Sequence, residues 1–194
     1  DRAGLVGADG PTHAGSFDTT YLSTLPNFIV MAASDEAELV RMINTSTEIN
    51  DRPCAFRYPR GTGLGSILPS INEKIEIGKS KVIKEGKKLA ILNFGARLNE
   101  TLKAAENLSK KGLPITVIDA RFAKPLDENL IWQLATTHEA IMTIEEGSIG
   151  GFGSHVVDFL TKKGLMDSNL KFRSLTLPDI FIDQDTPDKM YKMA

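Results

Sequence analysis

A loop at residues 1–15, "DRAGLVGADGPTHAG", gathers residue types that could bind and transform a small substrate. Arg2 carries a planar guanidinium that can hold a phosphate or carboxylate group through two hydrogen bonds. Asp9 can accept hydrogen bonds from sugar hydroxyls, and His13 can exchange a proton with a substrate oxygen near neutral pH. The glycines among them let a ligand approach the main chain closely. The same composition is typical of an ordinary exposed turn, so the residue types alone leave both interpretations open.

A second group of candidates lies in "FRYPRG", residues 56–61. Along a strand, Arg57 and Tyr58 point to opposite faces, whereas Arg60 lies beyond Pro59, where a loop can redirect it. This spacing predicts one arginine in a structural ion pair and one aimed at an anion. Two ordinary surface arginines are the alternative.

The third candidate, "EEGSIGGFGSH" at residues 145–155, resembles a phosphate-binding loop through its three closely spaced glycines. The pattern is incomplete, because Val156 stands where a later glycine is required and no Lys-Ser or Lys-Thr pair follows. A tight strand-to-helix turn is therefore favoured. Glu145 and Glu146 are adjacent, so on a strand they face apart and do not form a shared acid–base pair.

Alternating strands and helices must position these loops. Buried strands are predicted at residues 28–33, 53–58, 89–95, 115–119, 140–144 and 172–177, and helices at 17–25, 35–49, 100–111, 128–138 and 154–163. Ser34 is predicted to cap the second helix and Asp127 a later one. The pattern predicts an α/β fold with a largely parallel sheet, in which catalytic groups lie on loops beyond the carboxyl ends of strands. Residues 61–78 are rich in Gly, Pro, Ser and Asn, which predicts a domain boundary there.

Composition excludes several classes of protein. Apolar residues make up 41% and charged residues 25% of the 194 residues, which is typical of a globular fold rather than a disordered chain. The net charge of −2 gives no electrostatic reason to expect a nucleic acid or an anionic membrane as partner. No apolar run approaches the roughly 18 residues that a membrane span needs. The single cysteine, Cys54, is interpreted as an inert buried thiol and favours a reducing, cytoplasmic compartment.

Four segments occur in an order that resembles the thiamine-diphosphate-dependent, transketolase-like family, and within it the 1-deoxy-D-xylulose-5-phosphate synthases. They are "DRAGLVGADGPTHAGSFDTTYLSTLPN", "AFRYPRG", "LAILNFGARLNETLKAA" and "DARFAKPLDENLI". Asp-Gly-Pro-Thr-His is shared with transketolases, whereas "DRAG" and "RYPRG" favour the synthase branch. The resemblance runs from Asp1 to about Asp183 and covers only the closing part of a full family member. Since the chain also begins without methionine, we expect a piece of a longer protein.

The resemblance implies a fold and a reaction. It implies the end of a pyrimidine-binding domain at residues 1–66, a linker at 67–77, and a C-terminal transketolase-type domain at 78–194 with three αβα layers and a mostly parallel sheet. The implied reaction condenses pyruvate with glyceraldehyde 3-phosphate with loss of carbon dioxide, and it supplies the synthesis of isoprenoids, thiamine and pyridoxal. A cytoplasmic homodimer is also implied.

The resemblance further implies roles for individual residues. Arg2 and Arg60 match the arginines that hold the phosphate of the acceptor, and Asp9 matches the carboxylate that bonds a substrate hydroxyl. His13 matches the catalytic histidine beside the reacting carbon. The glutamate that activates the cofactor and the diphosphate and metal motif lie upstream of Asp1 in the family. Thiamine diphosphate and Mg²⁺ are therefore expected to be bound mainly by residues absent here, and no cofactor or metal residue is assigned. The 194-residue chain is expected to be inactive alone.

Two alternatives remain open at this point. One is a transketolase, which moves a two-carbon ketol unit between sugar phosphates. The other is a non-catalytic module that mediates dimerisation or binds a ligand, because residues 78–194 carry no chemistry of their own in the sequence.

Overall fold

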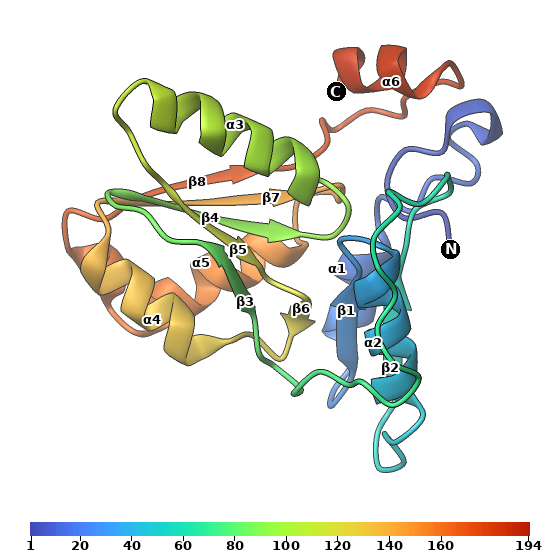
Figure 1. Ribbon diagram of the computed structural model, residues 1–194, viewed down its shortest axis with the longest axis horizontal. Coiled ribbons are helices and arrows are strands. Elements are labelled where there is room, and N and C mark those ends of the chain that lie inside the picture. The colour runs from blue at the N-terminus through green and yellow to red at the C-terminus, as the bar shows by residue number, and fades with distance from the viewer.

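The computed structural model describes residues 1–194, which form two α/β units joined by a long segment without helix or strand (Figure 1). The first unit contains the 3₁₀ turn η1 (Gly7–Asp9), α1 (Asp18–Thr24), β1 (Ile29–Ala32), α2 (Glu36–Ser46) and β2 (Cys54–Arg57). The second contains β3 (Lys81–Lys84), β4 (Leu89–Phe94), α3 (Leu98–Lys110), β5 (Thr116–Asp119), β6 (Phe122–Lys124), α4 (Glu128–Thr137), β7 (Ala140–Glu145), α5 (Phe152–Lys162), η2 (Leu165–Asp167), β8 (Lys171–Leu175) and α6 (Pro187–Met193).

The second unit is built on a five-stranded sheet in the order β3-β5-β4-β7-β8. β4 pairs in parallel with both β5 and β7, and β7 pairs in parallel with β8. Only β3 runs antiparallel, against β5 at one edge. The prediction of a largely parallel sheet is confirmed.

Helices cover both faces of this sheet, which gives the predicted three layers (Figure 1). Side chains of β4 alternate between the two faces, as the period of a strand requires. Leu92 and Phe94 pack with the side of α4 and α5, where Phe152 lies, whereas Ile91 packs with Ala105 of α3. None of the helices is both long and apolar enough to cross a membrane.

A second, three-stranded sheet in the order β2-β1-β6 joins the two units. β1 pairs in parallel with β2 of its own unit and antiparallel with β6 of the second unit. All four residues of β1 are buried. The units therefore share a sheet as well as the connecting segment.

The sequence did not predict β3, β6 or α6. β6 is only three residues long and exists through its pairing with β1, so its signal is tertiary rather than local. α6 shows no long apolar periodicity, but its Met190 is fully buried against Leu5 and Ile182. The C-terminal helix is thus held by the loop at the start of the chain.

The predicted N-cap of α2 was wrong by one residue. Asp35 caps the helix, because its carboxylate accepts a hydrogen bond from the backbone N–H of Glu38 at 2.8 Å. The hydroxyl of Ser34 instead donates to Asp119 of the second unit at 2.6 Å. A buried carboxylate needs hydrogen-bond donors. Because the hydroxyl of Ser34 donates to Asp119, it does not cap the helix.

Asp119 belongs to a set of buried charges at the junction of the two units. It is 1% exposed, and its second oxygen accepts the backbone N–H of Arg121 at 3.2 Å. The side chain of Arg121 reaches back to Glu38 on α2, with 2.8 Å between Nε and Oε2. The contacts of Ser34 with Asp119 and of Arg121 with Glu38 each join the two units, so these groups hold α2 against the second unit.

The titration of Asp119 tests this junction. Desolvation raises the pKa of Asp119 to about 6, despite the hydrogen bond from Ser34. The folded state then binds a proton more tightly than the unfolded chain, so this group adds stability as the pH falls through about 6. Urea titrations at roughly pH 7.5 and pH 5 give the change in the free energy of unfolding between these two conditions. On lowering the pH, we expect Asp119→Asn to gain about 1–1.5 kcal/mol less stability than the wild type. Asp158→Asn, at an exposed site, is the control, and equal pH dependence of Asp119→Asn and wild type would contradict the assignment.

Candidate functional site

The loop at residues 1–15 folds back on itself and against the end of β2. Gly4 donates its backbone N–H to Gly15 at 3.0 Å, and Gly15 donates to the carbonyl of Arg2 at 2.8 Å. Ala3 donates to the carbonyl of Tyr58 at 2.9 Å. A Cβ on Gly15 would lie 2.2 Å from the carbonyl oxygen of Arg2, so only glycine allows the two ends of the loop to meet.

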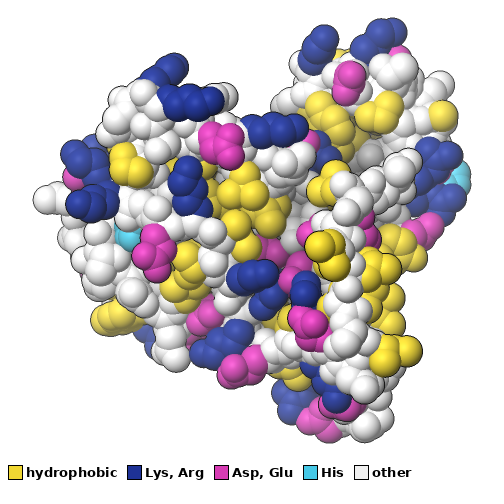
Figure 2. Space-filling model, in the orientation of Figure 1, with side chains coloured by type: hydrophobic (Ala, Val, Ile, Leu, Met, Phe, Trp, Pro, Cys, Tyr) yellow, Lys and Arg dark blue, Asp and Glu magenta, His cyan; other side chains and the backbone are white.

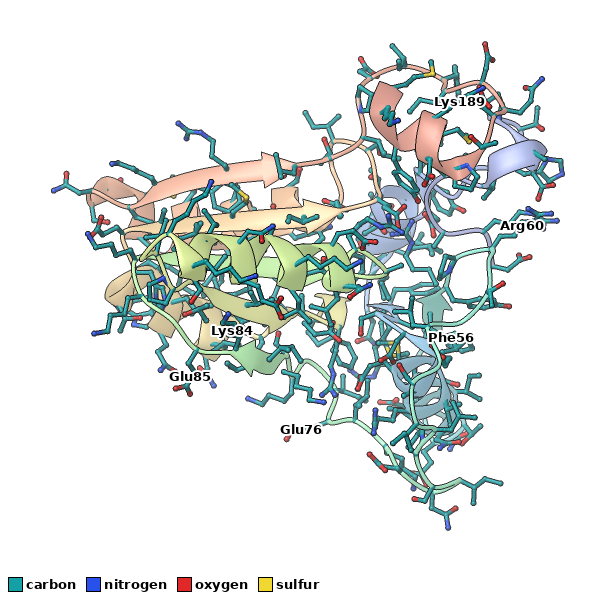
Figure 3. The ribbon with its side chains drawn as sticks, turned by 45° about the horizontal axis from the view of Figure 1, so that its top comes forward. Phe56, Arg60, Glu76, Lys84, Glu85 and Lys189 are labelled. Atoms are coloured by element: carbon teal, nitrogen blue, oxygen red, sulfur yellow. The ribbon has the colours of Figure 1, made fainter.

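This closure brings together three of the residues that the sequence pointed to. The Nε atoms of Arg2 and Arg60 both lie 3.0 Å from the same oxygen, Oδ2 of Asp9. The hydrogen bond from Arg2 lowers the pKa of Asp9, and the charges of both arginines lower it further. Figure 3 shows Arg60 on the side of the first unit away from the five-stranded sheet. We call these three residues the arginine–aspartate cluster.

The cluster is open to solvent. The side chain of Arg2 is 37% exposed and that of Arg60 is 52% exposed, so both guanidiniums retain N–H groups that a ligand can reach. Arg2 also has a backbone φ of 64°, in the left-handed region that residues other than glycine rarely occupy. The hydrogen bonds on either side of Arg2 impose this conformation, which is the kind of local strain that gathers at functional sites.

His13 lies on the same loop but outside the hydrogen bonds of the cluster. Its side chain is exposed, and Nδ1 lies 2.9 Å from the hydroxyl of Thr12. Its charge contributes to lowering the pKa of Asp9, which places it in the electrostatic neighbourhood of that carboxylate. The structure brings His13 near the cluster, and its catalytic role stays a prediction.

The two arginines of "FRYPRG" lie in different environments. Arg57 is 7% exposed and its Nε lies 2.9 Å from Oδ2 of Asp18. Nη2 of Arg57 donates to the carbonyls of Gly15 and of Glu146. The prediction of a structural ion pair is confirmed for Arg57, whereas Arg60 reaches the solvent-facing cluster.

A cavity of about 840 Å³ lies between the two units, where the surface is hollowed in Figure 2. It opens at the carboxyl ends of β1, β2 and β4, the position where open α/β sheets bind ligands. Arg60 lines this cavity, but Arg2, Asp9 and His13 do not. The cluster is therefore at the border of the cavity and not inside it.

Sequence reasoning missed two side chains on the wall of this cavity, Arg97 and Tyr191. The guanidinium of Arg97 lies over the ring of Tyr191, 4.4 Å from its centroid, and Nε lies 3.3 Å from Glu146. The hydroxyl of Tyr191 donates to the buried carboxylate of Glu146. Arg97 lies in the segment "LAILNFGARLNETLKAA", but nothing in the sequence assigned it a role, and only the packing of α6 brings it to Tyr191.

The glycine-rich segment 145–155 is a strand-to-helix turn, as predicted. The carboxylate of Glu145 accepts the backbone N–H groups of Phe152 and Gly153 at 3.0 and 2.8 Å, and so fills the N-terminus of α5. A Cβ on Gly151 would lie 2.3 Å from Glu145, which leaves no space for a phosphate. Glu146 faces the other way, as the strand geometry required. Desolvation raises the pKa of both carboxyls.

Cys54 and the two other histidines, His138 and His155, show no sign of reactivity. Burial raises the pKa of the half-buried Cys54 thiol, which fits the interpretation of an inert residue. Burial also lowers the pKa of His138 and His155, so the neutral imidazole is favoured at both. At the end of α4, His138 therefore complements the helix dipole only weakly. The chain holds no group of three or more His, Cys, Asp or Glu side chains placed to bind a metal ion.

Comparison with known families agrees with the two units. Residues 78–194 match the family model described as "Transketolase, C-terminal domain", and residues 1–63 match "Transketolase, pyrimidine binding domain". The chain therefore belongs to the transketolase family, whose members depend on thiamine diphosphate. The predicted fold and the resemblance to the transketolase-like family are confirmed, while the synthase branch stays a prediction.

Two solved structures are similar over nearly the whole chain. A protein described as "Split gene transketolase, inactive beta4 tetramer" is 29% identical, with a TM-score of 0.78 over 92% of this chain and 57% of that chain. A transketolase from Campylobacter jejuni subsp. jejuni NCTC 11168 is 18% identical, with a TM-score of 0.68 over 98% of this chain and 28% of that chain. The second likeness shows the fold alone. This chain spans less than two thirds of either protein.

The role of Glu145 as an internal cap predicts a loss of stability on truncation. Glu145→Ala leaves two buried N–H groups without an acceptor, so we expect the free energy of unfolding in urea to fall by about 1–3 kcal/mol. Glu145→Gln keeps one acceptor oxygen and should lose less. Glu139→Ala, at an exposed position, is the control and should change little. Full stability in Glu145→Ala would show that Glu145 does not hold the start of α5.

The arginine–aspartate cluster predicts a gain of anion binding when its carboxylate is neutralised. Asp9→Asn frees both guanidiniums from their shared partner, so inorganic phosphate should bind to the chain about three- to tenfold more tightly at low ionic strength. The shifts of arginine Nε–H resonances in NMR titrations measure this affinity. Asp51→Asn, which breaks a more exposed pair with Arg52, is the control. An equal effect of both variants would mean that the cluster is not a specific anion site.

Proposed function

We propose that the chain is the acceptor-binding part of a 1-deoxy-D-xylulose-5-phosphate synthase, which condenses pyruvate with glyceraldehyde 3-phosphate and releases carbon dioxide. The observation that carries the proposal is the convergence of Arg2 and Arg60 on Asp9, from opposite ends of the first unit. Two guanidiniums beside one point suit the double negative charge of a phosphate monoester. The segments "DRAG" and "RYPRG", which supply these arginines, are also those that favour the synthase branch.

In the absence of substrate, Asp9 pairs with both arginines and balances one of their two positive charges. An arriving phosphate group competes with Asp9 for their N–H donors, because the exposed guanidiniums can turn towards it. Asp9 would then be free to accept a hydrogen bond from a substrate hydroxyl. The cluster would thus recognise both ends of a short phosphorylated sugar.

We propose His13 as the catalytic residue of this chain. Its exposed imidazole lies on the loop that carries Asp9, close enough to influence the pKa of that carboxyl. An imidazole titrates near neutral pH, so it can give a proton to a substrate oxygen and take one back. Its role would be proton exchange with the acceptor held by the arginines.

The residues of this chain do not fit a diphosphate and metal site. The chain has no group of three or more acidic, cysteine or histidine side chains placed to hold a metal ion, and Glu145 already fills the glycine-rich helix start. We propose that thiamine diphosphate and Mg²⁺ are bound mainly by residues outside these 194. The cofactor, when bound, supplies the electron sink of the reaction, and this chain supplies the acceptor contacts. The chain alone is therefore expected to be inactive.

An exposed apolar patch supports the proposal that the protein assembles with a second copy of itself. Phe17, just before α1, is 44% exposed, Tyr21 of α1 is 59% exposed, and Phe181 is 75% exposed. The rings of Phe17 and Phe181 meet edge to face at 6.0 Å, so the patch spans both units. An exposed aromatic surface of this kind is typical of an interface. We further propose that the protein acts in the cytoplasm and has no nucleic acid or membrane as partner.

A transketolase that transfers a two-carbon ketol unit is the second candidate. It is supported by the two family matches and by the Asp-Gly-Pro-Thr-His sequence at residues 9–13. The two enzymes differ in their first substrate, since a transketolase takes a ketose and releases no carbon dioxide. A non-catalytic, ligand-binding module is the third possibility, and activity of the full-length protein excludes it.

The full-length enzyme distinguishes these functions. With pyruvate and glyceraldehyde 3-phosphate, we expect release of carbon dioxide and formation of a five-carbon sugar phosphate. Arg60→Ala should raise the KM for glyceraldehyde 3-phosphate about tenfold or more, because it removes one charge-assisted contact with the phosphate, and should leave the KM for pyruvate unchanged. Arg52→Ala is the matched control.

Three outcomes would count against parts of this proposal. Ketol transfer between sugar phosphates without release of carbon dioxide would identify a transketolase. An unchanged KM in Arg60→Ala would remove Arg60 from the acceptor site. Turnover by the purified 194-residue chain, confirmed by its intact mass, would show that it holds the cofactor itself.

A further inference from the structure

The side chain of Arg57 contacts two segments that are far apart in the sequence, residues 15–18 and Glu146. Its Nε pairs with Asp18 in the first turn of α1, and Nη2 donates to Gly15 at the end of the loop 1–15. The same Nη2 lies 3.1 Å from the carbonyl oxygen of Glu146 in the second unit. The guanidinium is buried, and every partner is fixed in the main chain or in a helix.

Gly15 connects Arg57 to the arginine–aspartate cluster. Gly15 closes the loop by donating its N–H to the carbonyl of Arg2. Arg57 itself ends β2, and Arg60 follows three residues later in the loop beyond Pro59. One guanidinium therefore fixes the base of the loop that carries Arg2 and Asp9 relative to the segment that carries Arg60.

We propose that Arg57 is a positioning residue, whose buried guanidinium sets the separation of Arg2 and Arg60 so that both can bind one phosphate group. The identity of the ligand as a phosphorylated acceptor rests on the proposed function. The geometric claim, that Arg57 holds the two arginines around Asp9, does not rest on that function.

The contacts of Arg57 require an arginine. A planar guanidinium reaches acceptors in several directions at once, whereas a lysine ammonium at the end of a flexible stem cannot hold the same three partners. The charge of Arg57 is balanced by Asp18, and at 7% exposure its guanidinium does not meet a ligand. A substitution at position 57 therefore acts on the cluster through the position of the loop.

The experiment uses the whole chain and its arginine Nε–H resonances in NMR spectra. In the ligand-free protein, the Nε atoms of Arg2 and Arg60 both lie 3.0 Å from Oδ2 of Asp9, so Asp9→Asn should change the shifts of both Nε–H groups. We expect Arg57→Lys to move both resonances and to weaken the binding of inorganic phosphate about tenfold, which is the loss of one well-aligned charged contact. Arg52→Lys, at an exposed arginine, should change neither.

The two readouts separate this inference from the proposed function. If Arg57→Lys leaves the resonances of Arg2 and Arg60 in place in a folded protein, the positioning role is overturned. If the resonances move but the wild type does not bind phosphate, Arg57 still positions the cluster and the proposed acceptor site fails. If Arg57→Lys does not fold, Asp18→Asn weakens the same anchor while keeping a hydrogen-bond acceptor, and its effect on the two resonances decides in the same way.

Discussion

The pairing of β1 with strands on both of its edges is the interaction on which the rest of the structure depends. β2 comes from the same unit and β6 from the other, so one fully buried strand joins two halves that the connecting segment alone would leave loosely linked. The carboxyl ends of β1, β2 and β4 then meet at the same junction. The cavity lies at this junction, with Arg60 of the arginine–aspartate cluster on its border, because loops that follow parallel strands are where open α/β folds bind ligands.

Buried charges give the junction its specificity, and each of them has a partner. Asp119 accepts a hydrogen bond from the hydroxyl of Ser34, and Glu146 accepts one from the hydroxyl of Tyr191. Glu38 forms an ion pair with Arg121. Burial of unpaired charges would be very costly, so this arrangement allows little freedom in how the units dock. Arg57 belongs to the same system, since it ties the first loop to the second unit through the carbonyl of Glu146. Stability and the geometry of the site therefore depend on the same contacts.

The sequence predicted the elements that carry their own signal. The apolar run of β4, the periodicity of α3 and the Asp127 cap of α4 are local features, and each was found close to its observed position. β6, α6 and the hydroxyl of Ser34 could not be predicted, because each is decided by a partner distant in sequence.

The candidate site likewise combines residues that the sequence could indicate with contacts that only the fold shows. Residue types and family resemblance singled out Arg2, Asp9 and Arg60, but only the fold shows that one carboxylate oxygen joins them. Arg97 and Tyr191 were missed because their contact exists only after α6 packs on the first unit.

We propose above all that the arginine–aspartate cluster recognises a phosphate group on a short carbon chain. The most direct measurement compares glycerol 3-phosphate with glycerol in titrations of the chain, following the Nε–H resonances of Arg2 and Arg60. The account predicts that glycerol 3-phosphate shifts both resonances along one saturable curve and that glycerol shifts neither. Equal responses to the two compounds, or a response of only one arginine to the phosphate, would contradict it.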